Sequence, residues 1–222
     1  MSIEIGFLLY PGVTQLDFSG PFEVFARVPD ARVHLVAGSL DPITSDTGLR
    51  VLPTTTFADC PALDVLCVPG GPHVESVYDD ADAMAFLQAQ GANARFVTSV
   101  CTGSLILGAA GLLKGFKATS HWTSVDMLKH FGAIPTAGRV VTDRNRITGG
   151  GVTAGIDLAL TVVAALAGER VAKMIQLGLE YNPAPPFACG HPDSADPDIV
   201  APVLAAMKDR IERRRDRAES FA

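Results

Sequence analysis

The chain has 222 residues, of which 48% are hydrophobic and 19% charged, a balance typical of a globular protein. Its formal net charge of -6 makes nucleic acid and anionic membranes unexpected partners. The apolar runs are shorter than the ~18 residues of a membrane span, and the start "MSIEIGFLLY" lacks the features of a secretory signal. We therefore expect a cytoplasmic protein, folded as a single domain over residues 1–222.

Strand-like and helix-like runs alternate in the first half of the chain. Apolar and β-branched runs predict strands at residues 3–10, 32–39, 64–71 and 95–100. Helix-like runs lie between and after them, at residues 21–28, 80–92 and 102–113. Residues 43–57 alternate about Gly48 and predict a small antiparallel hairpin.

The second half continues the same pattern. Residues 138–151 predict two short strands around a turn. Three further helices are expected, at residues 152–167, 169–181 and 198–222, and the Pro-rich stretch 182–197 predicts a loop. Apolar strands alternating with helices indicate an α/β fold, in which a mostly parallel sheet is sandwiched by helices.

Cys101 is the first candidate for chemistry, because it stands between the strand "RFVTSV" and the helix that opens at Thr102. Ligands of open α/β sheets bind beyond the carboxyl ends of the strands, and a tight strand-to-helix turn projects its side chain there. The other cysteines, Cys60, Cys67 and Cys189, form no C-x-x-C pair and have no His at metal-ligand spacing, so neither a metal site nor a disulfide framework is expected. The alternative for Cys101 is a buried structural cysteine.

The helix after Cys101 should favour a thiolate. Its positive end contributes on the order of 1 kcal/mol, which lowers a thiol pKa by a little under one unit. This leaves a mixed population of thiol and thiolate, so further donors are needed for a mostly ionised nucleophile. Backbone N–H groups at Thr102 and Gly103 could supply them.

Two glycine clusters end neighbouring predicted strands. Gly70 and Gly71 in "VPGG" let backbone N–H groups approach a ligand, as an oxyanion hole requires, although an ordinary turn would look the same. The run Gly149–Gly151 opens the helix at Val152, but its spacing does not match a dinucleotide loop, so no nicotinamide cofactor is expected.

No histidine adjoins Cys101, which leaves the choice of acid or base open. His121 in "TSHWTS" is a pocket candidate, and the other histidines are weaker ones. Asp17 is the acid candidate, since it follows the first strand at the edge where Cys101 should emerge. Alternatively, Asp17 or Ser19 caps a helix that begins at Gly20-Pro21.

Three stretches carry a family resemblance. "VPGG", "RFVTSVCTGSLILGAAGLLKG" and "ATSHW" resemble the ThiJ/PfpI superfamily, which is related to class I glutamine amidotransferases. Within it, "LLYPGVTQLDFSGPFEVF", "VCTGSLILGAAGLL" and "GGGVTAGIDLAL" resemble the branch that hydrates isocyanides. Many superfamily members have His directly after the cysteine, whereas this chain has Thr102, which disfavours protease and glyoxalase activities. The same sheet occurs in AraC-type regulators, but the helix-turn-helix half of those proteins is not found here.

The resemblance implies a flavodoxin-like sandwich and a homodimer that hydrates isocyanides to N-substituted formamides without a cofactor or metal. It also implies Cys101 as nucleophile, Asp17 as acid/base and Thr102 as a polar neighbour, with a covalent thioimidate as intermediate. The remaining implied site residues are backbone groups at Gly71, Gly150 and Val152 and, for an apolar substrate, side chains of Phe18, His121 and Trp122. Another cysteine-dependent activity, such as a glyoxalase or hydrolase, or a redox sensor without turnover, is the alternative.

Overall fold

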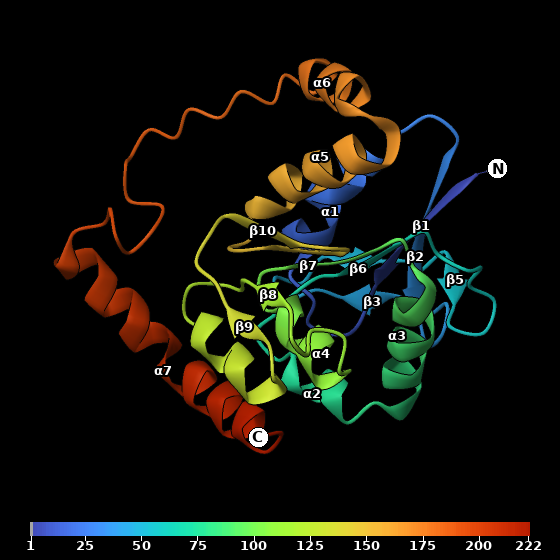
Figure 1. The fold of residues 1–222 in the computed structure, drawn as a ribbon. Coiled ribbons are helices and arrows are strands. Elements are labelled where there is room, and N and C mark those ends of the chain that lie inside the picture. The colour runs from blue at the N-terminus through green and yellow to red at the C-terminus, as the bar shows by residue number, and fades with distance from the viewer. Residues whose placement is uncertain (1) are drawn as a thin grey trace.

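The computed structural model describes residues 2–222 and centres on a seven-stranded sheet (Figure 1). The strand order is β10-β11-β7-β6-β1-β2-β5, and every neighbouring pair is parallel except β10 and β11. The bounds are β1 Ile3–Leu8, β2 Ala31–Ala37, β5 Thr55–Thr56, β6 Val65–Val68, β7 Phe96–Val100, β10 Val140–Asp143 and β11 Arg146–Gly149. The predicted parallel α/β sheet is therefore confirmed.

Two small two-stranded sheets flank the main one. The predicted hairpin is present as β3 (Ile43–Thr44) paired antiparallel with β4 (Arg50–Val51). The end of the predicted 43–57 hairpin is not part of it. There β5 pairs in parallel with β2 at the edge of the main sheet. The parallel pair β8 (Lys117–Ala118) and β9 (Ile134–Pro135) was not predicted.

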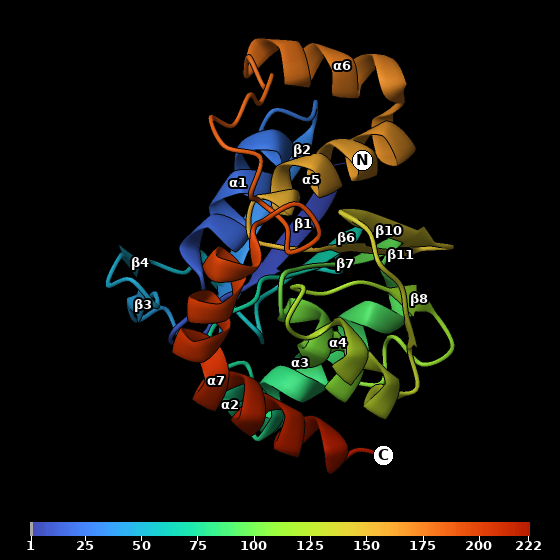
Figure 2. The same cartoon turned by 90° about the vertical axis from the view of Figure 1, so that its left-hand side faces the viewer.

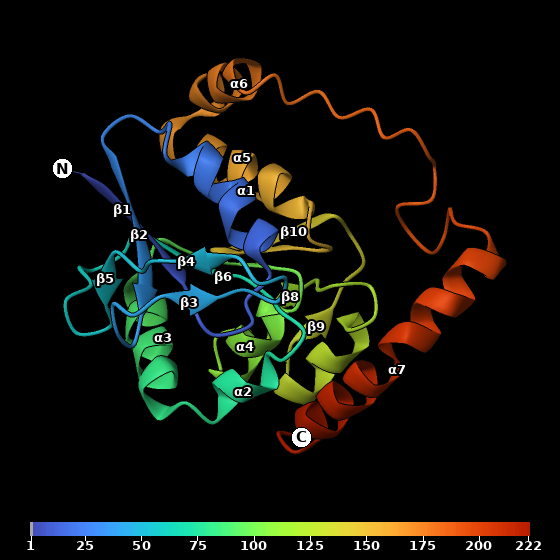
Figure 3. The ribbon, with the colours of Figure 1, turned by 180° about the vertical axis from the view of Figure 1, so that it is seen from behind.

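Helices cover both faces of the sheet (Figures 1 and 3). On one face α1 packs against α5, and α6 lies outside α5; α2, α3, α4 and the 3-10 helix η1 lie on the other face. The bounds are α1 Gln15–Phe25, α2 Glu75–Tyr78, α3 Ala81–Asn93, α4 Gly103–Ala109, η1 Val125–Phe131, α5 Ala154–Ala167 and α6 Glu169–Gly178. No helix among residues 2–222 combines the length and hydropathy needed to cross a bilayer.

Local chemistry explains most helix ends. The Asp80 side chain accepts a hydrogen bond from the Ala83 N–H and so caps the start of α3. Just after the C-terminal end of α4, Gly111 adopts a positive φ of 77°. This turn ends the helix earlier than the predicted range 102–113. Gly168, at φ 91°, separates α5 from α6 as expected.

The last helix, α7 (Pro197–Glu219), is reached through an exposed segment without regular structure at residues 181–196. Both features agree with the prediction of a loop followed by a C-terminal helix. Figure 2 shows α7 passing beside α2. Ion pairs hold it there, because Arg213 pairs with Glu75 and Arg217 pairs with Asp79.

The topological switch point lies between β1 and β6. Chain order runs outward from β1 to β2 on one side and from β6 to β7 on the other. Loops that leave the carboxyl ends of strands on either side of such a point diverge and leave a crevice between them. Asp17, Gly70 and Cys101 all follow strands at this end of the sheet, so the topology brings them together.

Candidate active site

Cys101 occupies a strained turn between β7 and α4. Its φ is 57°, in the left-handed region that residues with a Cβ rarely adopt. The backbone around it holds this conformation: its N–H is shared between the carbonyls of Gly149 (3.1 Å) and Gly150 (2.8 Å). Its carbonyl accepts hydrogen bonds from the hydroxyls of Ser104 (3.3 Å) and Ser120 (3.1 Å). Such strain tends to persist where it serves function, and it is the geometry of a nucleophile elbow.

Asp17 is fully buried on α1, at 0% exposure. Its Oδ2 accepts a hydrogen bond from the Gly70 N–H at 2.8 Å, while its Oδ1 has no hydrogen-bond partner within residues 2–222. Helix α1 begins at Gln15 with Thr14 at its N-cap, and Pro21 lies inside the helix. The alternative that Asp17 or Ser19 caps a helix beginning at Gly20 is therefore wrong, because the helix starts before both residues.

The charges of Asp17 and Cys101 are coupled. Burial raises the pKa of Asp17 to about 7, and the Gly70 N–H and the neighbouring Cys101 thiol offset only part of that rise. Burial also raises the pKa of the Cys101 thiol, and the negative charge of Asp17 raises it further. The expected fall in the thiol pKa is thus wrong: Cys101 is 7% exposed, and the free-energy cost of burying a thiolate exceeds the stabilisation that the helix end provides.

Thr102 ties the two strand ends together. Its hydroxyl donates to the Gly71 carbonyl and accepts from the Gly71 N–H, each at 3.0 Å. The Thr102 backbone N–H lies beside the Cys101 sulfur and favours its ionised form. Little room is left here, since a Cβ on Gly70 would meet the Thr102 nitrogen and hydroxyl at 2.6 Å and Asp17 Oδ2 at 2.9 Å.

The glycine N–H groups do not form the free oxyanion hole that the sequence suggested. The Gly70 N–H binds Asp17, the Gly71 N–H binds Thr102, and the Gly150 N–H donates to the Arg139 carbonyl at 2.9 Å. These hydrogen bonds instead fix the positions of Asp17, Thr102 and the Arg139 backbone. Val152 is half-buried and packs against the core at the start of the turn before α5.

The predicted pocket residues separate into two groups. Phe18 is part of the buried core, at 5% exposure. His121 and Trp122 lie in the loop after β8, with ring centroids 5.7 Å apart, and His121 Nδ1 is 2.8 Å from the Thr123 hydroxyl. Burial, followed by Arg214 and Arg210, lowers the pKa of His121 to about 4, so this ring is neutral at neutral pH.

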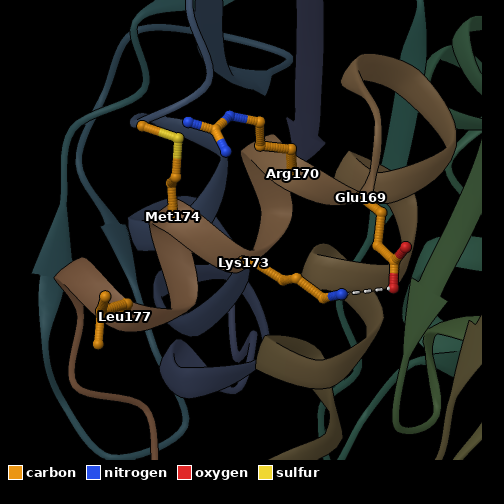
Figure 4. A pocket seen from close by; sticks show the side chains of 5 residues that line it. All are labelled: Glu169, Arg170, Lys173, Met174 and Leu177. Carbon is orange, nitrogen blue, oxygen red and sulfur yellow. Dashed lines mark ion pairs between the residues drawn. The ribbon is translucent and has the colours of Figure 1, made fainter.

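Trp122 lines a hollow of about 110 Å³ between its own loop, the 181–196 segment and the start of α7. Its other walls come from Cys189, Gly190, His191, Pro192, Ala195, Ile199, Val200 and Val203. A larger hollow of about 410 Å³ lies elsewhere, on α6 (Figure 4). All its lining residues come from that one exposed helix, and its Lys173–Glu169 ion pair (2.9 Å) is exposed, so nothing in it converges on a substrate.

Two residues beside the candidate site were missed by sequence reasoning. Tyr10 is buried, and its hydroxyl donates to the Pro69 carbonyl at 3.1 Å. Burial raises its pKa, and negative charge on Asp17 and Cys101 raises it further. Its position at the end of the first strand was a usable signal, because strand ends line the crevice. Arg214 comes from α7 and is 3% exposed. The run of charged residues around Arg214 predicts a solvated helix face, and for the Arg214 side chain this prediction is wrong.

Among residues 2–222, no three His, Cys, Asp or Glu side chains gather in a group that could hold a metal ion. The polar groups that converge are instead the Cys101 thiol, the Asp17 carboxylate and the Thr102 backbone and hydroxyl. A thiol beside a carboxylate that titrates near neutrality can pass one proton between them. That arrangement fits nucleophilic attack on a small electrophile.

Comparisons with known proteins place the whole chain in a family. The chain is 56% identical over 200 residues to isonitrile hydratase of Pseudomonas putida, covering 90% of this chain and 88% of that protein. A ThiJ/PfpI family protein from Pseudomonas syringae superimposes with a TM-score of 0.92 at 48% identity, over 100% of this chain and 90% of that one. The transcriptional regulator GbdR of Pseudomonas aeruginosa is 28% identical over 78% of this chain, which spans 49% of the regulator. The model of the DJ-1/PfpI family matches residues 4–165, and the chain belongs to that family.

Proposed function

We propose that the protein hydrates isocyanides, R–N≡C, to N-substituted formamides through a covalent bond to Cys101. The observation that carries the proposal is the buried pair formed by the Cys101 thiol and the Asp17 carboxylate, whose pKa of about 7 suits an acid and a base alike. The 56% identity to an isonitrile hydratase supports the substrate class.

In the first step the sulfur attacks the terminal carbon of the isocyanide. Because burial opposes a free thiolate, Asp17 takes the thiol proton as the S–C bond forms and delivers it to the same carbon. The isocyanide carbon gains one bond to sulfur and one to hydrogen. The product is a thioimidate, R–N=CH–S–Cys101, with Asp17 again ionised.

In the second step water replaces the sulfur. The water oxygen adds to the thioimidate carbon while Asp17 accepts one proton of that water, and Asp17 then passes this proton to the imine nitrogen, which gives the adduct R–NH–CH(OH)–S–Cys101. The C–S bond of this tetrahedral adduct then breaks, the hydroxyl proton passes through Asp17 to the departing sulfur, and the formamide R–NH–CHO leaves. The sum is one isocyanide and one water consumed for each formamide formed, with no electrons gained or lost.

Thr102 keeps the reacting groups aligned. Its backbone N–H favours negative charge on the sulfur at the moment of attack and of departure. Its hydroxyl, bonded twice to Gly71, anchors the loop that presents the Gly70 N–H to Asp17. The apolar hollow beside Trp122 is the proposed place for the substituent R.

The test is to mix the protein with para-nitrophenyl isocyanide and measure the corresponding formamide by chromatography. The matched control is Cys101→Ala, which should make none. Methylglyoxal is assayed in parallel. Turnover of methylglyoxal without formamide production would contradict the proposal in favour of another cysteine-dependent activity of the family.

Two implications of the resemblance remain predictions. A homodimer is expected to appear as twice the chain mass in light scattering after size-exclusion chromatography. The exposed apolar side chains of Met174 (61%) and Leu177 (82%) on α6 are consistent with such an association.

A cytoplasmic location is tested by fractionating the source cells.

A further inference from the structure

Arg214 is an unusual residue for the end of a charged helix, because its side chain is buried while its neighbours are solvated. It is 3% exposed, and its Nη1 donates to the Ser124 hydroxyl at 2.8 Å. Its Nε is buried without a hydrogen-bond partner within residues 2–222. A buried guanidinium without a bonded carboxylate is costly unless another negative group offsets its charge.

The pairs on either side of Arg214 fix its position. Arg213 binds Glu75, and its Nη2 lies 3.1 Å from His73 Nδ1, while Arg217 pairs with Asp79. These contacts clamp α7 to α2 and to the loop that follows β6 (Figure 2). The buried residues of α7 are Arg214 and Ala218, and the clamp places the Arg214 side chain against the Ser124 hydroxyl.

That loop leads directly to the nucleophile. The Ser124 N–H binds the His121 carbonyl at 2.7 Å, and the adjacent Ser120 hydroxyl binds the Cys101 carbonyl at 3.1 Å. The Arg214 charge is near enough to Cys101 that each stabilises the ionised form of the other. Asp17 acts on Cys101 in the opposite sense.

We propose that Arg214 is a positioning residue of the active site, the buried cation that partly offsets negative charge on Cys101. The inference rests on the proposed function, since it assumes that Cys101 is the reactive thiol. It makes the C-terminal helix, which lies outside the 4–165 range of the family match, a functional part of the site. Arg214 acts through Cys101 and is not assigned a contact with the substrate.

Other titratable groups also face this pair. Tyr10 lies beside Cys101, and Tyr78 and Glu75 of α2 lie near Arg214. Burial raises the pKa of both tyrosines, so they stay neutral through the range of the experiment. His121 is neutral there as well, since its pKa is lowered to about 4.

The experiment measures how fast iodoacetamide alkylates Cys101 between pH 6 and pH 10, by peptide mass spectrometry. Arg214→Gln keeps a donor for Ser124 but removes the charge, whereas Arg214→Lys keeps the charge. We expect the Gln variant to react roughly tenfold more slowly at pH 7, with its profile displaced upward by about one unit. The Lys variant should stay within about threefold of the native protein. Arg215→Met, an exposed position on the same helix outside the clamp, is the matched control and should leave the profile unchanged.

Each alternative outcome contradicts either the role of Arg214 or the proposed function. A folded Gln variant with the native profile overturns the role of Arg214, and so does a Lys variant that slows as much as the Gln variant. If the Gln variant does not fold, the folded Lys variant decides, since a slowed Cys101 there contradicts an electrostatic role. Native protein that makes no formamide from para-nitrophenyl isocyanide would contradict the proposed function together with this inference. A reactive Cys101 unaffected by Arg214 would sink the inference alone.

Discussion

Replacing Asp17 with Asn separates the chemical role of the carboxylate from its structural one. Asn keeps an oxygen for the Gly70 N–H but cannot exchange protons with Cys101. Positioned acid–base groups contribute about 10²- to 10⁴-fold to rates, so we expect Asp17→Asn to lower formamide production by at least about 100-fold.

Although Asp17→Asn should lower the rate, it should raise the free energy of unfolding relative to the native protein as pH rises. The folded pKa of about 7 lies above the ordinary value of 3.8, so Asp17 favours the folded state at low pH and increasingly opposes it as pH rises toward 7. At about 1.4 kcal/mol per unit, this raised pKa costs about 4 kcal/mol at pH 8 and about 1.5 kcal/mol at pH 5. The Asn variant escapes that cost. Its stability relative to the native protein should therefore improve by about 2.5 kcal/mol between pH 5 and pH 8.

Urea unfolding at both pH values, alongside the formamide assay, measures the two effects. Asp80→Asn is the control, because Asn caps α3 as Asp does and the residue lies outside the site. An Asp17→Asn protein that keeps its rate within threefold of native would refute the acid–base role. An unfolding free energy that falls equally at both pH values would refute the raised pKa.

Three further changes test the rest of the site. Cys101→Ser should abolish formamide production and leave the thermal midpoint within a few degrees of native by calorimetry, because the hydroxyl is a far weaker nucleophile of similar size. Thr102→Val should cost about 1–3 kcal/mol in urea unfolding, since it leaves the buried N–H and carbonyl of Gly71 without their partner, and it should slow turnover as well. Gly103→Ala should cost more than about 3 kcal/mol by the same assay, because a Cβ there would collide with the backbone oxygen of Val68 in β6. The control for Gly103→Ala is Gly178→Ala at the end of α6, where a Cβ meets nothing within 4 Å, so it should be neutral or stabilising by up to about 1 kcal/mol.

The outcomes that would contradict these expectations are specific. A folded Cys101→Ser protein with native turnover would remove the sulfur from the mechanism. An unchanged unfolding midpoint in Thr102→Val would mean that the double hydrogen bond to Gly71 adds nothing. Equal stability of Gly103→Ala and Gly178→Ala would show that the close approach of α4 to β6 is not required.

The sheet could be predicted because its signals are local. Continuous apolar runs mark β1, β6 and β7, and the turn at residues 143–145 marks the β10–β11 pair. Cys101 was found for the same reason, since a strand-to-helix seam is visible in the sequence. The short β9 and α2 were missed, because elements of two to four residues carry little periodicity.

The electrostatics of the site could not be predicted from the sequence. The thiol pKa depends on burial, which the whole fold sets, and burial outweighs the local effect of the helix end. Arg214 lies 113 positions from Cys101, and only the docking of α7 against α2 brings it near. Likewise, the glycine N–H groups look free in the sequence and are bonded to Asp17 and Thr102 in the fold.

The covalent step is tested most directly by acid-quenching the protein within milliseconds of mixing it with para-nitrophenyl isocyanide, followed by peptide mass spectrometry. We expect the peptide that contains Cys101 to gain the mass of one isocyanide, and the modified fraction to decay as formamide appears. Steady formamide production with Cys101 unmodified at every time point would contradict a mechanism that passes through its sulfur.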